Sequence, residues 1–182
     1  MKIISTAIPD VTIVESSIYN DHRGRFARLF CDEELSNILG HRHIVQINCS
    51  YTKQVGAVRG LHYQHPPHAE MKFVRCIKGR VWDIALDLRR ESPAFLKWHA
   101  EVLSSTDLKM LVIPECCAHG FQVLEPDSEL LYLHTASYSK DVEDGVRYDD
   151  PQISINWPLP VMDLSEKDRR YPFLSEKFLP KK

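Results

Sequence analysis

A cluster of polar side chains lies between residues 59 and 74, in the stretch RGLHYQHPPHAEMKFV. The stretch places three histidines, a glutamate and a lysine around a Pro-Pro turn, between two segments that alternate like β-strands. Such residues can bind a metal, exchange protons with a substrate, or form a polar corner of an ordinary β-protein. The choice among these three decides what the protein does.

The metal interpretation rests on His62, Gln64, Glu70 and His119. Their spacing resembles the ligand pattern of metal-binding cupin barrels, in which G-x5-H-x-H-x3-4-E is followed by P-x-G-x-x-H. The match is degraded, because Gln64 stands at the second histidine and a neutral amide is a poor ligand for a transition metal. In addition, Glu70 comes too late and Cys116 replaces the glycine. We therefore expect no metal, but we keep the cupin-like fold.

His62 differs from the other histidines because it lies in the middle of a predicted strand. It shares its pleat parity with Gly56, Gly60 and Gln64, a row that is poor in apolar side chains. A polar row on the inner face of a small barrel predicts a wet cavity. The histidines for which the sequence indicates no partner are interpreted as ordinary core or surface residues: His41, His43, His99 and His134.

Four further polar residues have both a structural and a functional interpretation. Tyr132 and Tyr138 alternate onto one face of LLYLHTASY, where tyrosines line many barrels without doing chemistry. Lys72 is either a solvated lysine or a cation in the cavity. Asp168 follows Ser165 by three residues, a spacing that resembles a capping box and favours a helix cap.

The elements that must position these residues are mostly strands. The apolar period between residues 44 and 138 is mostly two, which predicts strands at 44–48, 56–64, 71–77, 80–88, 97–103, 109–114, 119–124 and 129–138. Lys78-Gly79 predicts a hairpin between the third and fourth of these. Only residues 32–39 predict a helix, with acidic residues in the first turn and Gly40 just beyond the end.

Many short strands without alternating helices leave a sandwich, jelly roll or barrel as the fold. At 182 residues the chain fits one domain, in which residues 139–182, rich in Pro, Asp and charge, are predicted to wrap around the β-core. A net charge of -2 with both signs interspersed excludes a protein that binds nucleic acid or a membrane surface through charge.

The cysteines and the N-terminus indicate the compartment. Five cysteines, two of them adjacent, suit neither a disulfide framework nor a CxxC metal site, which indicates a reducing environment. The N-terminus lacks an apolar run followed by a small-residue cleavage site, and no segment approaches the roughly 20 apolar residues of a membrane span. We expect a cytoplasmic protein with no membrane partner.

Taken together and in order, several segments resemble the dTDP-4-dehydrorhamnose 3,5-epimerase family, whose members invert carbons of a nucleotide-linked 4-keto-6-deoxyhexose. The segments are DHRGRF, VQINCS, RGLHYQHPPHAEMKFVRC, VWDIALDLRRESPAFLKW, IPECCAHGF, LLYLHTASY, NWPL and LSEKD. The resemblance implies an all-β, cupin-like jelly roll (double-stranded β-helix) with a few short helices. It also implies a homodimer, a nucleotide-diphosphate sugar as substrate, and no metal or organic cofactor.

The resemblance also assigns roles by position. His62 matches the general base, Asp168 the carboxylate that orients it, and Tyr132 the acid on the opposite face of the sugar. Lys72 matches a cation near the developing enolate oxygen. The residues that match the lining of the nucleotide, diphosphate or sugar pocket, some of them reaching across the dimer, are Arg23, Phe26, Gln46, Asn48, Arg59, His119 and Tyr138. For Arg59 to face the same way as His62, a bulge or bend near Gly60 is required.

The sequence departs from the family pattern at positions that bear on specificity. Arg28 stands where the family commonly has an acidic residue, Glu70 where it usually has Gln, and Cys116-Cys117 replace a small and aromatic pair. The nucleotide base and the sugar stereochemistry therefore stay open. The alternatives are a single-site epimerase or ketoisomerase acting on a related CDP- or GDP-linked sugar, a sugar-binding cupin that has lost its chemistry, and a metal-dependent cupin oxygenase.

Overall fold

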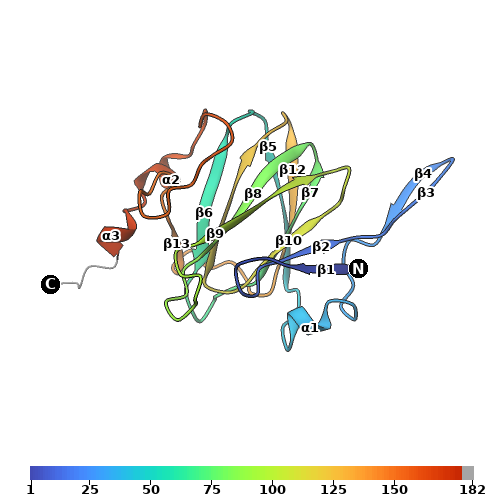
Figure 1. The fold of residues 1–182 in the computed structure, drawn as a ribbon, viewed down its shortest axis with the longest axis horizontal. Helices are drawn as coiled ribbons and strands as arrows, with labels where there is room; N and C mark the ends of the chain where they lie inside the picture. The colour runs from blue at the N-terminus through green and yellow to red at the C-terminus, as the bar shows by residue number, and fades with distance from the viewer. Residues whose placement is uncertain (178–182) are drawn as a thin grey trace.

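Two antiparallel sheets make up the body of the protein (Figure 1). The computed structural model describes residues 1–177. One sheet has the strand order β1 (Lys2–Ser5), β2 (Thr12–Glu15), β10 (Met110–Ile113), β7 (Lys72–Lys78), β12 (Ser128–His134) and β5 (Gln46–Thr52). The other has the order β13 (Glu143–Gly145), β6 (Val58–Gln64), β11 (Cys117–Val123), β8 (Arg80–Asp87) and β9 (Trp98–Ser104). The strands expected from the period-two pattern are thus present.

The core lies between the two sheets and is made by their central strands. Val74 and Leu111 from one sheet and Ala85 and Phe121 from the other are buried in one hydrophobic cluster. Burying a large apolar side chain stabilises the fold by about 1.5–3 kcal/mol. Strand β11 is buried along its whole length, so the polar residues it carries lie inside the protein rather than on its surface.

The predicted hairpin at Lys78-Gly79 is wrong. Strands β7 and β8 follow each other directly, but β7 pairs with β10 and β12, whereas β8 pairs with β11 and β9. Gly79 therefore joins the two sheets instead of closing a pair of strands. Its φ of +73° and a packing position against Ser128, where a Cβ would lie 2.4 Å from Oγ, explain the glycine.

The predicted helix at residues 32–39 is shorter than expected. Helix α1 spans only Ser36–Leu39, with Gly40 at its C-cap, and residues 32–35 form a turn. The Ser36 hydroxyl donates to the Glu33 carbonyl at 2.8 Å, a local bond that competes with helix formation. The acidic residues that suggested a first helical turn therefore belong to the preceding turn.

A β-bulge in β6 confirms the bend that the sequence requires near Gly60. His62 pairs with His119 and Gly60 with Gly120, so Leu61 is an extra residue without a partner on β11. The extra residue reverses the pleat parity, and Arg59 and His62 therefore line the same cavity. Gly60 has φ +121°, and a Cβ there would lie 2.5 Å from the Gly120 Cα, so only glycine fits.

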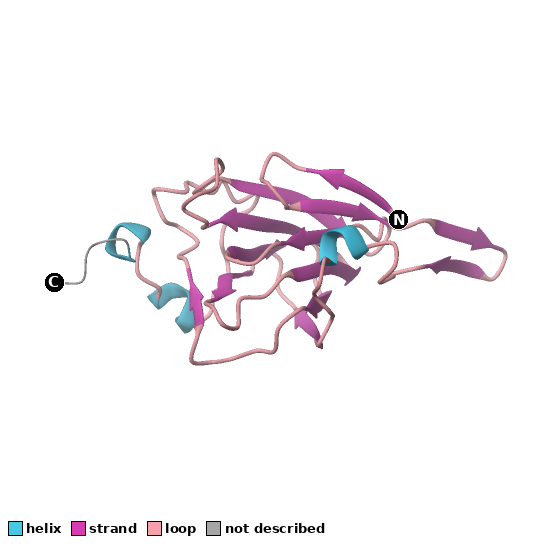
Figure 2. Ribbon diagram, turned by 90° about the horizontal axis from the view of Figure 1, so that it is seen from below, coloured by secondary structure: helices cyan, strands magenta, loops and turns pink. Residues whose placement is uncertain are grey.

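Two segments extend from opposite ends of the body. The hairpin of β3 (Ile18–Asp21) and β4 (Gly24–Ala27) projects away from both sheets (Figure 1, Figure 2). At the other end lie helices α2 (Glu166–Arg170) and α3 (Leu174–Lys177). The C-terminal segment contacts the body where β13 pairs with β6 and Asp163 bridges to Ala57. Residues 178–182, the end of the predicted wrapping segment, lie outside the described residues.

Candidate active site

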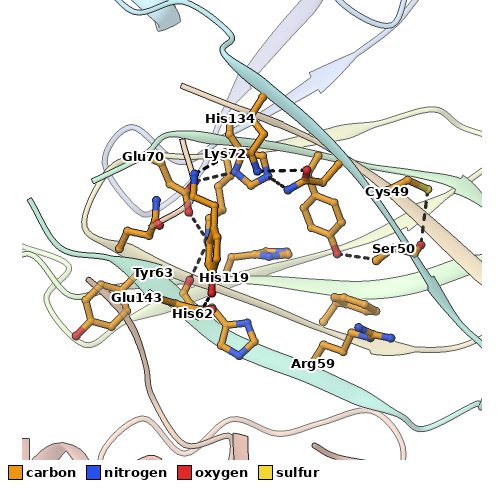
Figure 3. A pocket seen from close by; sticks show the side chains of 16 residues that line it. Cys49, Ser50, Arg59, His62, Tyr63, Glu70, Lys72, His119, His134 and Glu143 are labelled. Atoms are coloured by element: carbon orange, nitrogen blue, oxygen red, sulfur yellow. Dashed lines mark hydrogen bonds and ion pairs between the residues drawn. The ribbon is translucent and has the colours of Figure 1, made fainter. Parts of the chain in front are cut away.

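A cavity of about 270 Å³ opens between the two sheets, with walls from β5, β6, β7, β11 and β12 (Figure 3). Most of the predicted site residues line it. Those that the structure brings together here are Gln46, Asn48, Arg59, His62, Lys72, His119, Tyr132 and Tyr138. They come from strands far apart in the sequence, so the fold assembles the cavity.

His62 and Asp168 form a hydrogen-bonded pair at the wall of this cavity. Nε2 of His62 lies 2.6 Å from Oδ1 of Asp168, and the second carboxylate oxygen accepts the Gly60 N–H at 3.4 Å. Burial raises the pKa of the Asp168 carboxyl, but the hydrogen bond and charge of His62 outweigh burial and hold it below its ordinary value. A carboxylate only accepts, so Nε2 carries hydrogen and Nδ1 keeps the lone pair. His62 is therefore arranged as a base.

Asp168 reaches His62 because of how α2 begins. Ser165 is the N-cap, and its hydroxyl accepts the Asp168 amide at 3.0 Å, as the capping prediction requires. The Asp168 side chain is nevertheless directed at His62 and is almost fully buried. Asp168 thus takes part in the helix cap through its backbone amide and contacts the His62 imidazole through its carboxylate.

Tyr132 presents a protonated phenol to the same cavity. Its hydroxyl lies 3.0 Å from Oγ of Ser50 on the neighbouring strand β5. The ring is held between His119, edge-on with centroids 5.8 Å apart, and His134, stacked at 6.0 Å. Burial raises the pKa of Tyr132 well above its ordinary value, which outweighs the opposing hydrogen bond from Ser50. The phenol therefore stays protonated at neutral pH and can donate a proton.

Lys72 lies in the cavity and has fixed partners. Its ammonium forms an ion pair with Oε1 of Glu70 and donates to the main-chain carbonyl of His62, and Nζ lies 3.1 Å from each oxygen. The other oxygen of Glu70 lies 2.8 Å from Nδ1 of His134 (Figure 3). His134, interpreted from the sequence as an ordinary core or surface residue without a partner, is a buried residue that has partners and lines the cavity. His134 is buried beside Tyr132, in a charged network that the sequence did not indicate.

A second imidazole–carboxylate pair lies deeper. Nε2 of His119 is 2.7 Å from Oδ1 of Asp83, and both side chains are buried. Burial raises the pKa of the Asp83 carboxyl, and the attraction of His119 only partly offsets this. Sequence reasoning missed Asp83. The available signal was a carboxylate in the middle of the largely apolar strand RVWDIALDL, which must be partnered when buried.

One rim of the cavity is formed by side chains that bond to one another. Gln46 accepts the Tyr138 N–H at 3.0 Å and donates to Asn48 at 3.2 Å. The Tyr138 hydroxyl donates to Glu143 at 2.8 Å. Glu143, which also lines the cavity and pairs with Lys167 from α2, is a further residue that sequence reasoning missed. The sequence around Glu143 contains charged residues but no motif that would have indicated a site.

Arg23 and Phe26 do not reach this cavity within one chain. Both lie on the projecting β3–β4 hairpin, where Arg23 pairs with Asp21 at 2.6 Å and Phe26 is 72% exposed. The hairpin leaves the body at the end away from α2 (Figure 2). A single copy of the chain therefore assembles only part of the predicted site.

The residues of the degraded metal pattern are engaged separately. His62 bonds Asp168, Glu70 bonds Lys72 and His134, and His119 bonds the buried Asp83. Within residues 1–177, no group of three or more His, Cys, Asp or Glu side chains is arranged to hold a metal ion.

The five cysteines are all free thiols. In the same part of the chain, no helix has the length and apolar character needed to cross a membrane.

Comparison with known proteins agrees with this geometry. A family model described as dTDP-4-dehydrorhamnose 3,5-epimerase matches residues 5–176. The chain belongs to this family. A Shigella flexneri dTDP-4-dehydrorhamnose 3,5-epimerase is 42% identical over 169 residues, which cover 92% of this chain and 93% of the relative.

Solved structures of epimerases share the fold. The dTDP-4-dehydrorhamnose 3,5-epimerase of Elizabethkingia anophelis superimposes with a TM-score of 0.92 at 37% identity, covering 97% of this chain and 98% of the other. A Legionella pneumophila dTDP-6-deoxy-D-glucose-3,5-epimerase, in complex with dTDP-4-keto-L-rhamnose, gives 0.91 at 35% identity, covering 100% and 98%. The expected family and the cupin-like jelly roll are therefore confirmed, and with them an isomerase.

The departures from the epimerase pattern take different positions in the structure. Glu70 lies inside the cavity, whereas Arg28 lies on the segment after β4 and pairs with Glu34 at the surface. Cys117 is buried in β11, and Cys116 adopts φ +62° in the preceding turn, outside the cavity lining. Within one chain, Glu70 is the only one of these departures that lines the cavity.

Proposed function

We propose that the chain is an epimerase that inverts C3 and C5 of a nucleotide-diphospho-4-keto-6-deoxyhexose, of the dTDP-4-dehydro-6-deoxyglucose type, through an enolate. The observation that carries this proposal is the placement of three groups in one cavity. A histidine backed by a buried carboxylate, a protonated phenol and an ammonium are contributed by β6, β12 and β7. Each of the three has a distinct part in proton exchange next to a ketone.

The first step would remove a proton from the carbon beside the C4 ketone. Nδ1 of His62 takes the proton, the electron pair of the C–H bond moves into the ring, and the negative charge settles on the C4 oxygen as an enolate. The Asp168 carboxylate stabilises the resulting imidazolium. The Lys72 ammonium stabilises the enolate oxygen in a site that is partly closed to water.

The second step would return a proton on the opposite face. The enolate carbon takes it from the Tyr132 phenol, which leaves a phenolate, and the configuration of the carbon is inverted. The base and the acid are each worth about 10²–10⁴-fold in rate. Because one inversion leaves a protonated His62 and a deprotonated Tyr132, both must exchange protons with solvent before the second carbon reacts.

We propose that the reaction uses no metal and no organic cofactor. The ketone of the substrate already makes the neighbouring hydrogens acidic, and no electrons are gained or lost overall. The charge that a metal would otherwise stabilise is met by Lys72, which lies beside the His62 main chain. The reaction therefore needs only groups that this chain supplies.

We propose that the working form is a homodimer in which the hairpin of one copy completes the cavity of the other. Arg23 would supply a forked, permanently charged donor to the diphosphate, and Phe26 an aromatic face to the base. Phe26 and its hairpin neighbour Tyr19 are both largely exposed in the single chain. Strand β5, at the edge of its sheet, also exposes Ile47 and Tyr51 next to the cavity, and Val45 just before the strand is exposed as well.

The wider role is proposed in the same way. We propose a cytoplasmic enzyme that makes an activated deoxysugar for surface polysaccharide such as lipopolysaccharide O-antigen. Residues 1–182 would form a single jelly-roll domain, with residues 139–182 as a C-terminal segment wrapped on it. The pairing of β13 with β6, the bridge from Asp163 to Ala57, and the bond from Asp168 to His62 support that organisation.

The test is turnover of dTDP-4-keto-6-deoxy-D-glucose in D2O, followed by proton NMR. We expect deuterium at both C3 and C5 and a product with both centres inverted. If only one carbon is labelled, the proposed double inversion is wrong and the enzyme acts at a single site. Parallel assays with CDP- and GDP-linked substrates determine the nucleotide. His62→Ala should abolish incorporation while nucleotide-sugar binding is largely retained.

A further inference from the structure

Glu70 is a buried carboxylate in the cavity for which the proposed mechanism has no role. It is 8% exposed, and its two oxygens bond two different partners, Lys72 at 3.1 Å and His134 at 2.8 Å. Burial raises the pKa of Glu70, but these two partners together hold it below its ordinary value. An unpaired buried carboxylate would be costly. Glu70 is therefore an anion with both oxygens engaged.

The direction of the hydrogen bonds in this network follows from one main-chain donor. The Tyr138 N–H can only donate, so the Gln46 side chain presents its oxygen to Tyr138 and its nitrogen to Asn48. The Asn48 oxygen is then occupied, and the amide nitrogen of Asn48 donates to Nε2 of His134 at 3.3 Å. Because Nε2 accepts, the hydrogen of a neutral His134 is on Nδ1 and points to Glu70.

The Lys72 ammonium and the His134 N–H therefore meet different oxygens of Glu70, and only a carboxylate offers an accepting oxygen to each. A glutamine at this position, the usual residue in the family, has one oxygen and would set its NH2 group against one of the two donors. Either Lys72 would lose its partner, or His134 would have to change tautomer and break its bond to Asn48. The network of this chain is thus built around the negative charge of Glu70.

Lys72 is the member of the network that faces the proposed reaction. An ammonium has three N–H donors, of which one is held by the main-chain carbonyl of His62, and the ion pair with Glu70 orients the group. This leaves a donor for a ligand in the cavity that Lys72 lines. The position of Glu70 therefore decides where that donor points.

We propose that Glu70 is a positioning residue, which acts through Lys72 by holding the ammonium charged and directed at the site of the C4 oxygen. His134 in turn holds Glu70 in place, because the hydrogen bonds of the rim residues keep the hydrogen of a neutral His134 on Nδ1, which faces Glu70. This inference rests on the proposed epimerase function. The new element is the buried pair of Glu70 and His134. This pair links the residues at the rim of the cavity to the Lys72 ammonium, which stabilises the enolate oxygen in the proposed reaction.

The experiment is a double-mutant cycle between Glu70→Gln and Lys72→Met, with deuterium incorporation from D2O as the rate. Deleting a donor from an oxyanion site costs about 10²–10³-fold. Since Glu70→Gln leaves the donor in place, we expect a smaller loss in kcat, roughly tenfold, with KM within about threefold. In the Lys72→Met background the same change should cost less than about twofold, because the group through which Glu70 acts is gone.

The pH profile separates positioning from a general loss of structure. Without the carboxylate, the buried ammonium loses its counter-charge, so the alkaline limb of kcat should move to lower pH in Glu70→Gln. Glu70→Asp, which keeps the charge, should retain the wild-type limb even if kcat falls. If Glu70→Gln does not fold, Glu70→Asp is the variant on which the role of Glu70 is tested. The matched control is Glu101→Gln, which removes the carboxylate from a Lys–Glu pair on β9 outside the cavity and should change none of these values.

The outcomes are distinct. If wild type shows no incorporation at all, the proposed function fails and this inference fails with it. If wild type exchanges but the two substitutions are additive, or the alkaline limb stays in place in Glu70→Gln, the function stands and the role of Glu70 is overturned. Non-additive loss with a shifted limb supports it.

Discussion

The Asp168 carboxylate meets His62 from the far end of the sequence, 2.6 Å from Nε2. Replacing it by the isosteric amide leaves the shape of the site but removes the charge that stabilises the imidazolium. We expect Asp168→Asn to lower kcat by roughly 10²–10⁴-fold, because the base loses both its orientation and its counter-charge. The measurement is the kcat–pH profile, in which the acid limb should move to lower pH. A limb that stays in place would mean that Asp168 acts only as a helix residue.

The same carboxylate should make stability depend on pH. A carboxyl whose folded pKa is depressed, as that of Asp168 is, contributes stability that is present above the unfolded pKa of about 3.9 and lost as pH falls through the folded pKa. In urea titrations, wild type should therefore exceed Asp168→Asn in free energy of unfolding at neutral pH. The difference should shrink below about pH 4. A difference that is constant with pH would contradict this linkage.

Tyr132 and His62 have separable effects in the proposed reaction. Tyr132→Phe keeps the ring that packs between His119 and His134 but removes the proton for the second face. The base can still remove and return a proton on its own face. We therefore expect deuterium incorporation without inversion, and a loss of epimerised product of roughly 10²–10⁴-fold. NMR of the recovered sugar distinguishes the two. Unchanged yield of inverted product would exclude the phenol as the acid.

At the level of single residues, some members of the site could be predicted from the sequence and others could not. The family pattern placed His62, Lys72 and Tyr132 in one cavity, and the structure agrees. Asp83 and His134 were missed because their partners lie on other strands or loops, and a period of two shows which face a side chain occupies but not what lies opposite. Only the strand order reveals those neighbours.

At the scale of elements, the bulge in β6 is what turns Arg59 and His62 to the same face. Gly60→Ala would place a Cβ 2.5 Å from the Gly120 Cα and 2.7 Å from the His119 carbonyl, and would strain a φ of +121°. We expect a loss of stability of about 2–6 kcal/mol, the sum of backbone strain and overpacking. Urea denaturation measures it.

Gly24→Ala is the matched control for that substitution. Gly24 also has a positive φ, +140°, but nothing lies within 4 Å of the added Cβ. It should therefore lose only the strain, about 1–3 kcal/mol. Equal losses at both positions would show that close packing against β11 does not contribute to the cost at Gly60.

The strands themselves were easier to predict than their partners. Alternation and turn residues located β5 to β12 well, because those signals are local. The pairing was not local: Gly79 looked like a hairpin turn but joins two sheets, since β7 and β8 are both buried by neighbours distant in sequence. The helix predicted at 32–39 was too long because residues 32–35 form a separate turn, whose Glu33 carbonyl accepts the Ser36 hydroxyl.

At the scale of the whole molecule, the projecting hairpin makes the proposed dimer testable by complementation. Arg23→Ala and His62→Ala chains should each be nearly inactive alone. When they are unfolded and refolded together, random pairing in a two-fold dimer gives half hybrids, each with one intact site, so activity should recover to roughly a quarter of wild type. If the mixture stays inactive while light scattering reports dimers, the hairpin does not complete the partner's cavity.

The position of Asp168 has a consequence for truncated chains. The base at His62 is translated early, and its carboxylate partner comes from a helix near the end of the chain. All the strands of the two sheets precede α2 in the sequence. A chain that stops before α2 therefore lacks the proposed partner of His62, and we expect it to lose at least as much activity as Asp168→Asn.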